Sequence, residues 1–321
     1  MKLATLSGNG PDGRLVVVSD DGSRFLAAEG LGTLQAALEA WDQAEPALRA
    51  LAARLADGKG ASLAAEAILA PLPRAWQWLD ASAYRSHGEL MERLFDTPPP
   101  APGRPLMYQG MSHVFLAPTQ DVPLPSEEDG IDFEGEFGVV TDRVPMGVTP
   151  AEAMKHIRLV VQINDWSLRA IAPIEMKTGF GWVQAKPACS VAPFAVTPDA
   201  LGAHWRDGRV HLPLLVDWNG RRFGAARGEA MGVGFHELIA HAAATRDLCA
   251  GTVIGSGTVS NDNYREVGSS CIAERRGIEI LDEGAPRTNY MRFGDTVRME
   301  AVLSDGGILF GAIDQRVVKS V

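Results

Sequence analysis

The chain has 321 residues, more than one hydrophobic core usually holds, so we expect a main domain with a smaller partner. Hydrophobic residues make up 46% of the chain, but no apolar run approaches the roughly 18 to 20 residues that a membrane-spanning helix needs. The formal net charge of −10, without clustered Lys and Arg, argues against a nucleic-acid-binding protein, and a carboxylate substrate would need local cations or a bound metal.

The sequence favours a cytosolic protein. Glycines interrupt the first ten residues, so we expect no secretory signal there. The three cysteines, Cys189, Cys249 and Cys271, are odd in number and far apart, which argues against a disulfide framework and fits a reducing compartment. We interpret them as buried free thiols.

The first elements are predicted to form a small β and helical domain. Apolar stretches bounded by turn residues predict strands at Lys2–Leu6, Leu15–Ser19 and Arg24–Ala27. Two helices are expected next: Thr33 can cap the first, and Pro46 can lie in the first turn of the second.

The prolines at positions 71 and 73 break helices, so we expect residues 1–70 to form this small domain and residues 71–321 to form a larger one. A second proline cluster at Thr97–Pro105 is interpreted as an exposed loop.

Helices are predicted at Pro150–Lys155 and Phe235–Ala244. Short β-branched stretches predict strands at Gly138–Thr141, Arg209–Val216, Thr252–Ile254, Thr296–Val302 and Ile308–Ile313. The pattern indicates a β-rich α+β protein.

The most informative segment is Asp132–Phe137, which reads Asp-Phe-Glu-Gly-Glu-Phe and predicts a strand. On a strand, Glu134 and Glu136 share one face because side chains alternate. Two carboxylates on a partly buried strand repel each other unless a cation lies between them. A hard metal ion would remove this repulsion. The alternative is an edge strand with a solvated acidic face.

Two further carboxylates follow apolar stretches. Asp165 comes where an apolar strand turns polar, and Asp80 follows an apolar-aromatic stretch and precedes His87 by seven residues. Each could simply be a helix or turn cap. Together with Glu134 and Glu136 they form an all-oxygen set, which suits Mg²⁺, Ca²⁺ or Mn²⁺ and not a structural zinc.

From about residue 70 onward, the motifs resemble the fumarylacetoacetate hydrolase family, in the family's order. The matching segments are Asp80 with His87, the acidic strand Asp132–Glu136, the Asn-Asp-Trp-Ser stretch Asn164–Ser167, Lys186 within Gly181–Ser190, and the Ser-Gly-Thr loop Gly255–Ser260. The resemblance implies the family's mixed β-roll, a homodimer, and Mg²⁺ or Ca²⁺ bound by Asp80, Glu134, Glu136 and Asp165. The first seventy residues resemble the small N-terminal domain of longer family members.

By the same resemblance, the expected catalytic groups are Lys186, His87 and Glu274. A divalent cation can chelate the two oxygens of a 1,3-dioxo or 2-oxo acid and stabilise the enolate formed when the adjacent carbon–carbon bond breaks. Lys186 could neutralise part of this charge, or it could form a structural salt bridge. His87 is expected to be the general base, although a lone histidine on a helix is more often a capping or core residue. Glu274 resembles the carboxylate that orients His87, with Glu89 as the alternative, and Arg275 could instead pair with Glu274.

Tyr108, Arg169 and Thr258 are the expected substrate-binding residues by the same resemblance. A buried tyrosine with a satisfied hydroxyl is the alternative for Tyr108. Arg169 matches the family, but Ala170 replaces the aspartate that normally follows it.

The leading hypothesis is a metal-dependent hydrolase that cleaves a carbon–carbon bond in a fumarylacetoacetate-type or acylpyruvate-type acid. The nearest rival is a decarboxylase or isomerase of a 2-oxo acid at the same metal. A working pair of His87 and Glu274 predicts hydrolysis, and its absence favours the rival. A hypothesis from another class is a noncatalytic, metal-stabilised binding protein.

Overall fold

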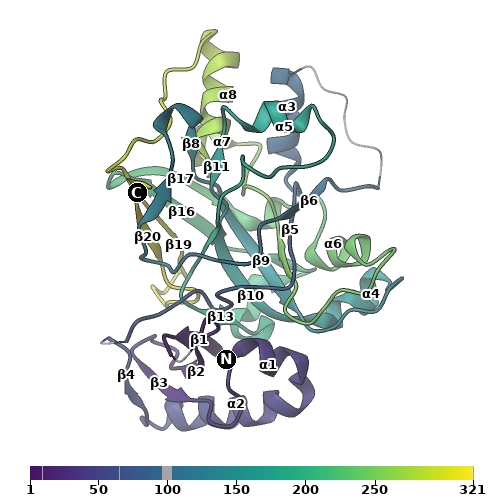
Figure 1. Cartoon of the computed structure of the whole chain (residues 1–321), viewed down its shortest axis with the longest axis vertical. Coiled ribbons are helices and arrows are strands. Elements are labelled where there is room, and N and C mark those ends of the chain that lie inside the picture. Colours follow the sequence, from purple (N-terminus) through teal and green to yellow (C-terminus); the bar gives the residue numbers. More distant parts are fainter. Residues whose placement is uncertain (9, 65, 96–102, 321) are drawn as a thin grey trace.

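The computed structural model describes residues 1–8, 10–64, 66–95 and 103–320, and it confirms a strand-rich α+β fold (Figure 1). Its largest element is an eleven-stranded sheet in the order β4-β3-β2-β1-β13-β10-β9-β18-β5-β6, with β12 beside β10. The strands are β1 (Lys2–Leu6), β2 (Arg14–Val18), β3 (Arg24–Ala27), β4 (Ala61–Ser62), β5 (Trp78–Ala81), β6 (Met107–Gly110), β9 (Gly135–Thr141), β10 (Ile157–Asn164), β12 (Ser190–Val191), β13 (Ala195–Val196) and β18 (Val253–Gly255).

A second sheet has the order β17-β16-β19-β20-β7. Its strands are β7 (Val122–Leu124), β16 (Pro213–Trp218), β17 (Arg221–Arg227), β19 (Thr296–Ala301) and β20 (Ile313–Lys319). The buried Gln162 on β10 joins the two sheets, because its side chain donates to the carbonyl of Met299 at 3.0 Å and accepts from the N–H of Ala301 at 2.7 Å. This bond pair satisfies a buried amide that would otherwise destabilise the core.

Shorter elements complete the fold. Two strand pairs are formed by β8 (Ile131–Asp132) with β11 (Ser167–Leu168) and by β14 (Trp205–Arg206) with β15 (Arg209–Val210). The α-helices are α1 (Leu34–Glu39), α2 (Trp41–Ala56), α3 (Arg85–Phe95), α4 (Pro150–Ala153), α5 (Ala172–Met176), α6 (Phe235–Ala242), α7 (Tyr264–Val267) and α8 (Ile272–Glu283). The 3₁₀-helices are Glu127–Asp129, Met154–His156, Pro198–His204 and Gly228–Ala230.

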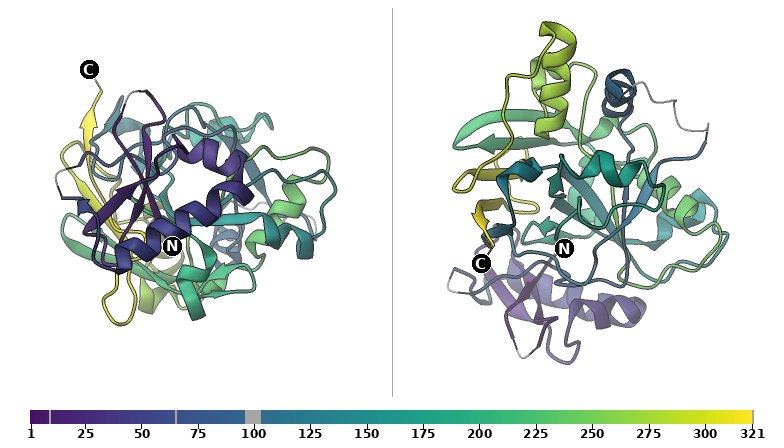
Figure 2. Two further views of the ribbon diagram at one scale, coloured as in Figure 1. Left: turned by 90° about the horizontal axis from the view of Figure 1, so that it is seen from below. Right: turned by 45° about the horizontal axis from the view of Figure 1, so that its top comes forward.

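The N-terminal elements lie at one end of the molecule (Figures 1 and 2). They continue the long sheet, because β1 pairs with β13 through Lys2 opposite Val196. Thr33 caps α1 as predicted, accepting the N–H of Ala36 at 3.1 Å. The placement of Pro46 in a first turn is wrong: α2 already begins at Trp41, so this proline lies inside the helix. The boundary near residue 70 stays a prediction.

Other departures from the predictions have local causes. The predicted strand Ile308–Ile313 is wrong, because Gly311 adopts a left-handed φ of 73° and the strand begins only at Ile313. The predicted strand Arg209–Val216 is split before Pro213, which has no N–H to give to a ladder. Cys249 is exposed, whereas Cys189 and Cys271 are buried as expected. Residues 97–102 of the predicted loop Thr97–Pro105 lie outside the described residues.

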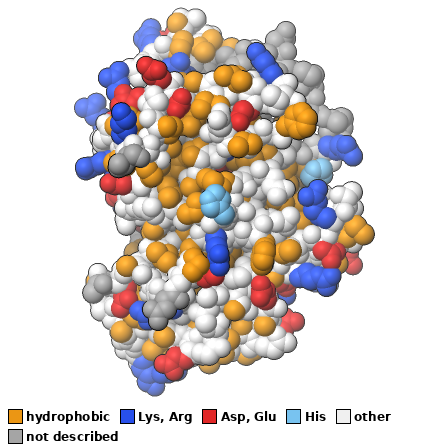
Figure 3. Space-filling view, in the orientation of Figure 1, with side chains coloured by type: hydrophobic (Ala, Val, Ile, Leu, Met, Phe, Trp, Pro, Cys, Tyr) orange, Lys and Arg blue, Asp and Glu red, His pale blue; other side chains and the backbone are white. Residues whose placement is uncertain are grey.

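Within the described ranges, no helix combines the length and the apolar character needed to cross a membrane. On the face shown in Figure 3, hydrophobic side chains gather toward the middle and most charged side chains lie nearer the edges. The four carboxylates predicted to bind a metal are buried and do not contribute to the charged surface. They are Asp80, Glu134, Glu136 and Asp165.

Candidate active site

Neighbouring strands of the long sheet bring two of the predicted carboxylates together. Asp80 lies on β5 and Glu136 on β9, and β18 lies between these strands with Gly255 opposite Asp80. A Cβ atom at position 255 would lie 2.4 Å from Oδ1 of Asp80 and 2.9 Å from Oε2 of Glu136. Glycine at this position therefore leaves the space in which the two carboxylates meet.

Asp80, Glu136 and Asp165 form a buried acidic cluster, in which one oxygen of each lies within 4.8 Å of the others. Their exposed fractions are 5%, 0% and 0%. Neither oxygen of Glu136 has a hydrogen-bond partner in the described part of the chain. Burial, followed by the charges of Asp80 and Asp165, raises the pKa of Glu136 well above its ordinary value. Burial and the charge of Asp165 raise the pKa of Asp80 to about 8.

This donor set fits a divalent cation. Three neighbouring buried carboxylates resist ionisation together, whereas a hard cation stabilises all three charges through oxygen ligands. The oxygens of Glu136 support this inference, because their one polar neighbour among the described residues is the carboxyl of Asp80, with which Glu136 can share a proton or a cation. Mg²⁺, Ca²⁺ and Mn²⁺ all accept such oxygen ligands.

Glu134, the fourth predicted metal ligand, is surrounded by donors. Its Oε1 accepts Nζ of Lys186 at 2.6 Å and lies 3.0 Å from Nη2 of Arg169. The hydroxyls of Ser167 and Thr258 donate to its two oxygens. Burial opposes the ionisation of Glu134, but Arg169 and Lys186 outweigh it and hold the pKa below its ordinary range. Glu134 is thus the ionised partner of two cations, and its binding of a metal stays a prediction.

The strand predicted to run through both glutamates is interrupted. β8 ends at Asp132 and β9 begins at Gly135, so Glu134 forms only an isolated bridge with Cys271. Its backbone N–H donates to the side chain of Asn164 at 2.9 Å. The alternation of a regular strand therefore does not extend from Glu136 to Glu134.

Asp165 accepts hydrogen bonds from three side chains. The hydroxyl of Tyr108 donates to Oδ2 at 2.6 Å, Nζ of Lys186 donates to the same oxygen at 2.7 Å, and the thiol of Cys189 donates to Oδ1 at 2.8 Å. The contact of Cys189 was missed, because the sequence shows only a buried thiol. The ring of Tyr108 packs edge-on against Trp182, with the ring centroids 4.7 Å apart.

Lys186 remains charged in this environment. Burial acts to lower its pKa, but Asp165 and Glu134 raise it above the ordinary value overall. The salt bridge considered for this lysine is present, with both of these carboxylates. Contact of Lys186 with a substrate stays a prediction.

His87 and Glu274, which lie on α3 and α8, face each other. Nδ1 of His87 is 3.0 Å from Oε2 of Glu274, whose side chain is fully buried. The alternative partner Glu89 is exposed. Arg275 donates to the carbonyl of Phe223 and forms no ion pair with Glu274. The geometry is that of a base whose ring is oriented by a carboxylate, which can activate water.

The three predicted substrate-binding residues all contact carboxylates of this region. Tyr108 donates to Asp165 and Thr258 to Glu134, as described above, and Nε of Arg169 donates to Asp132 at 2.8 Å. Their contacts with a substrate stay predictions.

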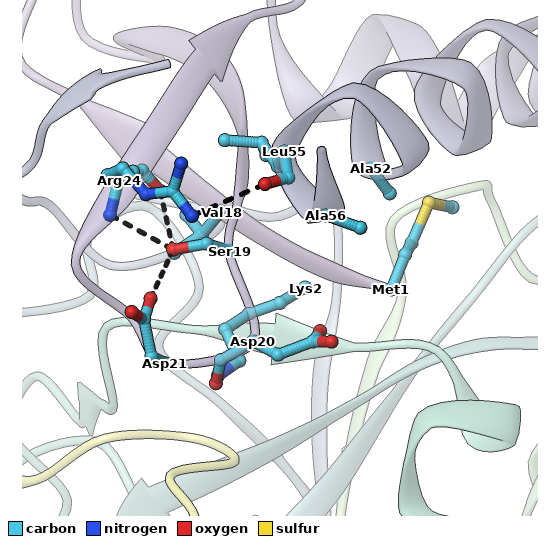
Figure 4. Close-up of a pocket in the computed structure, with 10 residues that line it drawn as sticks. All are labelled: Met1, Lys2, Val18, Ser19, Asp20, Asp21, Arg24, Ala52, Leu55 and Ala56. Carbon is cyan, nitrogen blue, oxygen red and sulfur yellow. Dashed lines mark hydrogen bonds between the residues drawn. The ribbon is translucent and has the colours of Figure 1, made fainter. Parts of the chain in front are cut away.

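A separate pocket of about 210 Å³ lies in the N-terminal region between the strands and α2 (Figure 4). Its polar side chains have partners within the protein: Ser19 donates to Asp21 at 2.5 Å, Arg24 donates to the carbonyl of Leu55 at 3.3 Å, and Lys2 donates to the carbonyl of Ile308 at 2.6 Å. None of the predicted site residues lines it. The acidic cluster and the His87–Glu274 pair therefore lie outside this pocket.

Comparison with protein families gives matches along nearly the whole chain. The family model described as "Fumarylacetoacetate (FAA) hydrolase C-terminal" matches residues 77–318. The model described as "Fumarylacetoacetase N-terminal domain 2" matches residues 1–74.

Individual relatives are distant. A 2,4-didehydro-3-deoxy-L-rhamnonate hydrolase from Sphingomonas sp. (strain SKA58) is 28% identical over 162 residues, which are 50% of this chain and 54% of the relative. The chain spans about half the length of the curated relatives it matches.

Two solved structures share the fold over both full chains. One is a maleylpyruvate hydrolase from Sphingobium sp. SYK-6 in complex with manganese(II) ion and pyruvate, at 17% identity and a TM-score of 0.68, with 100% of each chain covered. The other is a 5-carboxymethyl-2-hydroxymuconate delta-isomerase from Mycobacterium smegmatis, at 19% identity and a TM-score of 0.63, again with 100% of each chain covered.

Proposed function

The chain belongs to the fumarylacetoacetate hydrolase family, and we propose that it is a metal-dependent hydrolase that cleaves a carbon–carbon bond in a 1,3-dioxo acid of the fumarylacetoacetate or acylpyruvate type. The observation that carries this proposal is the contact between His87 and Glu274. A hydrolase must activate water, and a histidine oriented by a buried carboxylate is suited to that task.

Asp80, Glu136 and Asp165 would hold the cation, which we take to be Mg²⁺, with Ca²⁺ or Mn²⁺ as alternatives. When bound, a divalent ion supplies Lewis-acid stabilisation of negative charge on substrate oxygens. The manganese(II) and pyruvate in the solved maleylpyruvate hydrolase support a divalent ion and a 2-oxo acid substrate class.

His87 would take a proton from water through the ring nitrogen that Glu274 does not hold, and the water oxygen would attack the distal carbonyl carbon. Glu274 would keep the ring oriented and stabilise its protonated form. The bond between that carbon and its neighbour would break, leaving its electron pair on the 2-oxo acid fragment, to which His87 returns the proton. The products are a carboxylic acid and a 2-oxo acid. Lys186 would bring positive charge toward the developing anion.

Isomerisation of a 2-oxo acid at the same site is the second candidate. The likeness to a delta-isomerase supports it, because isomerisation also passes through an anion next to a carbonyl. The two functions differ in their products: hydrolysis releases two acids, whereas isomerisation leaves the carbon skeleton intact.

The test is loss of ultraviolet absorbance from a panel of acylpyruvates, fumarylacetoacetate and oxaloacetate, with products identified by chromatography. We expect cleavage of a dioxo acid with Mg²⁺ present, loss of activity after chelation, and loss in His87→Ala. His241→Ala, on α6, is the matched control and should retain activity. Turnover that leaves the carbon skeleton intact would replace hydrolysis with isomerisation, and turnover of oxaloacetate alone would replace it with decarboxylation. No turnover of any member would count against all three.

The family likeness also supports a homodimer. Light scattering should give twice the mass of the chain, and the mass of a single chain at working concentrations would contradict the proposal.

A further inference from the structure

Asp132 connects the two halves of the proposed site. It ends β8 and is fully buried. Its Oδ1 accepts the N–H of Ile272 at 2.7 Å, and its Oδ2 accepts the N–H of Ala273 at 2.9 Å and Nε of Arg169 at 2.8 Å. One carboxylate therefore bonds a helix backbone on one side and a guanidinium on the other.

The first turn of α8 depends on these bonds. Ile272 and Ala273 are its first two residues, and N–H groups at the start of a helix have no acceptor within the helix. A negative charge is favourable at this end because the helix dipole is positive there. Glu274 is the next residue, and it holds His87. The bonds from Asp132 thus fix the backbone directly before the carboxylate that orients the base.

On its other side, Asp132 leads to the acidic cluster. Arg169 joins it to Glu134, whose Oε1 lies 3.0 Å from Nη2 of the arginine. The same glutamate oxygen accepts Nζ of Lys186, and this ammonium group also donates to Asp165. A continuous series of charge pairs therefore runs from the acidic cluster to the start of α8.

We propose that Asp132 is a positioning residue that keeps the His87–Glu274 pair at a fixed place relative to the acidic cluster. The proposal rests on the proposed function, since it assigns the placement of the His87–Glu274 pair relative to the acidic cluster a role in catalysis. Removing the charge of Asp132 weakens the hold on α8 and lets Glu274 shift. Asp132 makes no direct bond to Asp80, Glu136 or Asp165, so we expect these carboxylates to keep their places.

The first variant is Asp132→Asn, which keeps the shape of the side chain and removes its charge. We expect kcat to fall by roughly 10- to 100-fold, the range that a misplacement of about 1 Å produces, with Mn²⁺ affinity within about threefold of wild type. Asp142→Asn is the control, because Asp142, like Asp132, accepts a hydrogen bond from an arginine but lies outside the site. Equal kcat in Asp132→Asn and wild type would overturn the proposal.

A double variant separates positioning from general stabilisation. In a Glu274→Gln background, Asp132→Asn should lower kcat by less than about threefold, because the group that it positions is already disabled. If the two losses multiply instead, Asp132 acts independently of Glu274 and the proposal fails.

A second pair of variants removes the bond from the helix side and serves if Asp132→Asn does not fold. Ile272→Pro deletes the N–H that Asp132 accepts at the first helical position, where proline is tolerated, and the extended Cys271 before it suits a following proline. Ile272→Ala deletes side-chain volume and keeps the N–H. The proline variant should lose several-fold more kcat than the alanine variant, and equal loss would overturn the proposal.

A spectroscopic readout separates this proposal from the proposed function. The side-chain N–H proton of His87 held by Glu274 should give a downfield signal that is absent in His87→Ala and lost in Glu274→Gln. Asp132→Asn should shift or broaden the signal, and Asp142→Asn should leave it unchanged. If wild type turns over no dioxo acid, the proposed function fails while this test still stands. An unchanged signal in Asp132→Asn would overturn the positioning role itself.

Discussion

Two glutamates only two positions apart lie in opposite surroundings. Glu134 accepts bonds from the ammonium of Lys186 and the hydroxyls of Ser167 and Thr258, and it lies beside the guanidinium of Arg169. Glu136 has no donor among the described residues and lies next to two other carboxylates. The same side chain is thus stabilised as an anion at one position and disfavoured as an anion at the other.

This difference shows which carboxylates have a charge still to be balanced. The cations around Glu134 already neutralise it, so its ionisation stabilises the fold. Glu136 gains most from a bound cation, because no donor among the described residues competes for its two oxygens. Each of the following predictions tests one side of this comparison.

Glu134→Gln should have the largest effect on stability. Removing the carboxylate leaves the buried positive charges of Lys186 and Arg169 without one of their negative partners. We therefore expect the free energy of unfolding to fall by about 3 to 5 kcal/mol. Urea denaturation of the metal-free protein measures this. Asp199→Asn, which breaks the exposed pair with Arg49, is the control and should change the same quantity by less than about 1 kcal/mol. Equal losses of stability in the two variants would contradict the claim that the buried ion pairs of Glu134 stabilise the fold.

Glu136→Gln should weaken metal binding without loss of stability. We expect Mn²⁺ affinity, measured by calorimetry, to fall by at least about 100-fold. Loss of a residue that only hydrogen-bonds a metal ligand lowers affinity by up to about 100-fold, and loss of a ligand itself should cost at least as much. The metal-free protein should be as stable as wild type or more so, because a buried carboxylate is replaced by a neutral amide. Unchanged affinity would show that Glu136 is not a ligand.

The stability of the metal-free protein should decrease as pH rises. An unfolded aspartate ionises near pH 4, whereas burial and Asp165 raise the pKa of Asp80 to about 8 in the fold. The stabilising contribution is therefore complete below about pH 4 and is lost as pH rises toward 8.

Thermal unfolding at several pH values in chelator should show this decrease, and Mg²⁺ should remove it. Asp80→Asn is the control, because it lacks the titrating group. A midpoint that does not fall with pH relative to Asp80→Asn would contradict the assignment.

Thr258→Val should have a smaller effect on stability than Glu134→Gln. It removes one hydroxyl donor from Glu134, and hydrogen bonds to charged groups contribute about 1.5 to 3 kcal/mol. Thr258→Ser keeps the donor and should remain within about 1 kcal/mol of wild type. If Thr258→Val instead raises KM with stability unchanged, the hydroxyl serves the substrate and not Glu134.

Local patterns in the sequence predicted local structure well. The strands Lys2–Leu6 and Arg24–Ala27 and the capping role of Thr33 are confirmed, because each depends on neighbours within a few residues. The failures at Pro46 and Ile308–Ile313 concern where an element begins: α2 starts at Trp41, ahead of Pro46, and the left-handed Gly311 delays β20 until Ile313.

The candidate site residues could be named from the sequence, but the contacts among them could not be predicted. His87 and Glu274 are separated by 187 positions, so only the family resemblance could pair them. The difference between Glu134 and Glu136 arises from donors contributed by distant segments, and no periodicity within the strand encodes it. The bond from Cys189 to Asp165 likewise depends on how two separate segments meet.

The most direct test of the central claim is anomalous scattering from crystals soaked with Mn²⁺. The account predicts a peak within bonding distance of Asp80, Glu136 and Asp165, with the density lost in Glu136→Gln. A peak elsewhere, or one retained in that variant, would contradict the claim that the unbalanced charge of this cluster is what binds the cation.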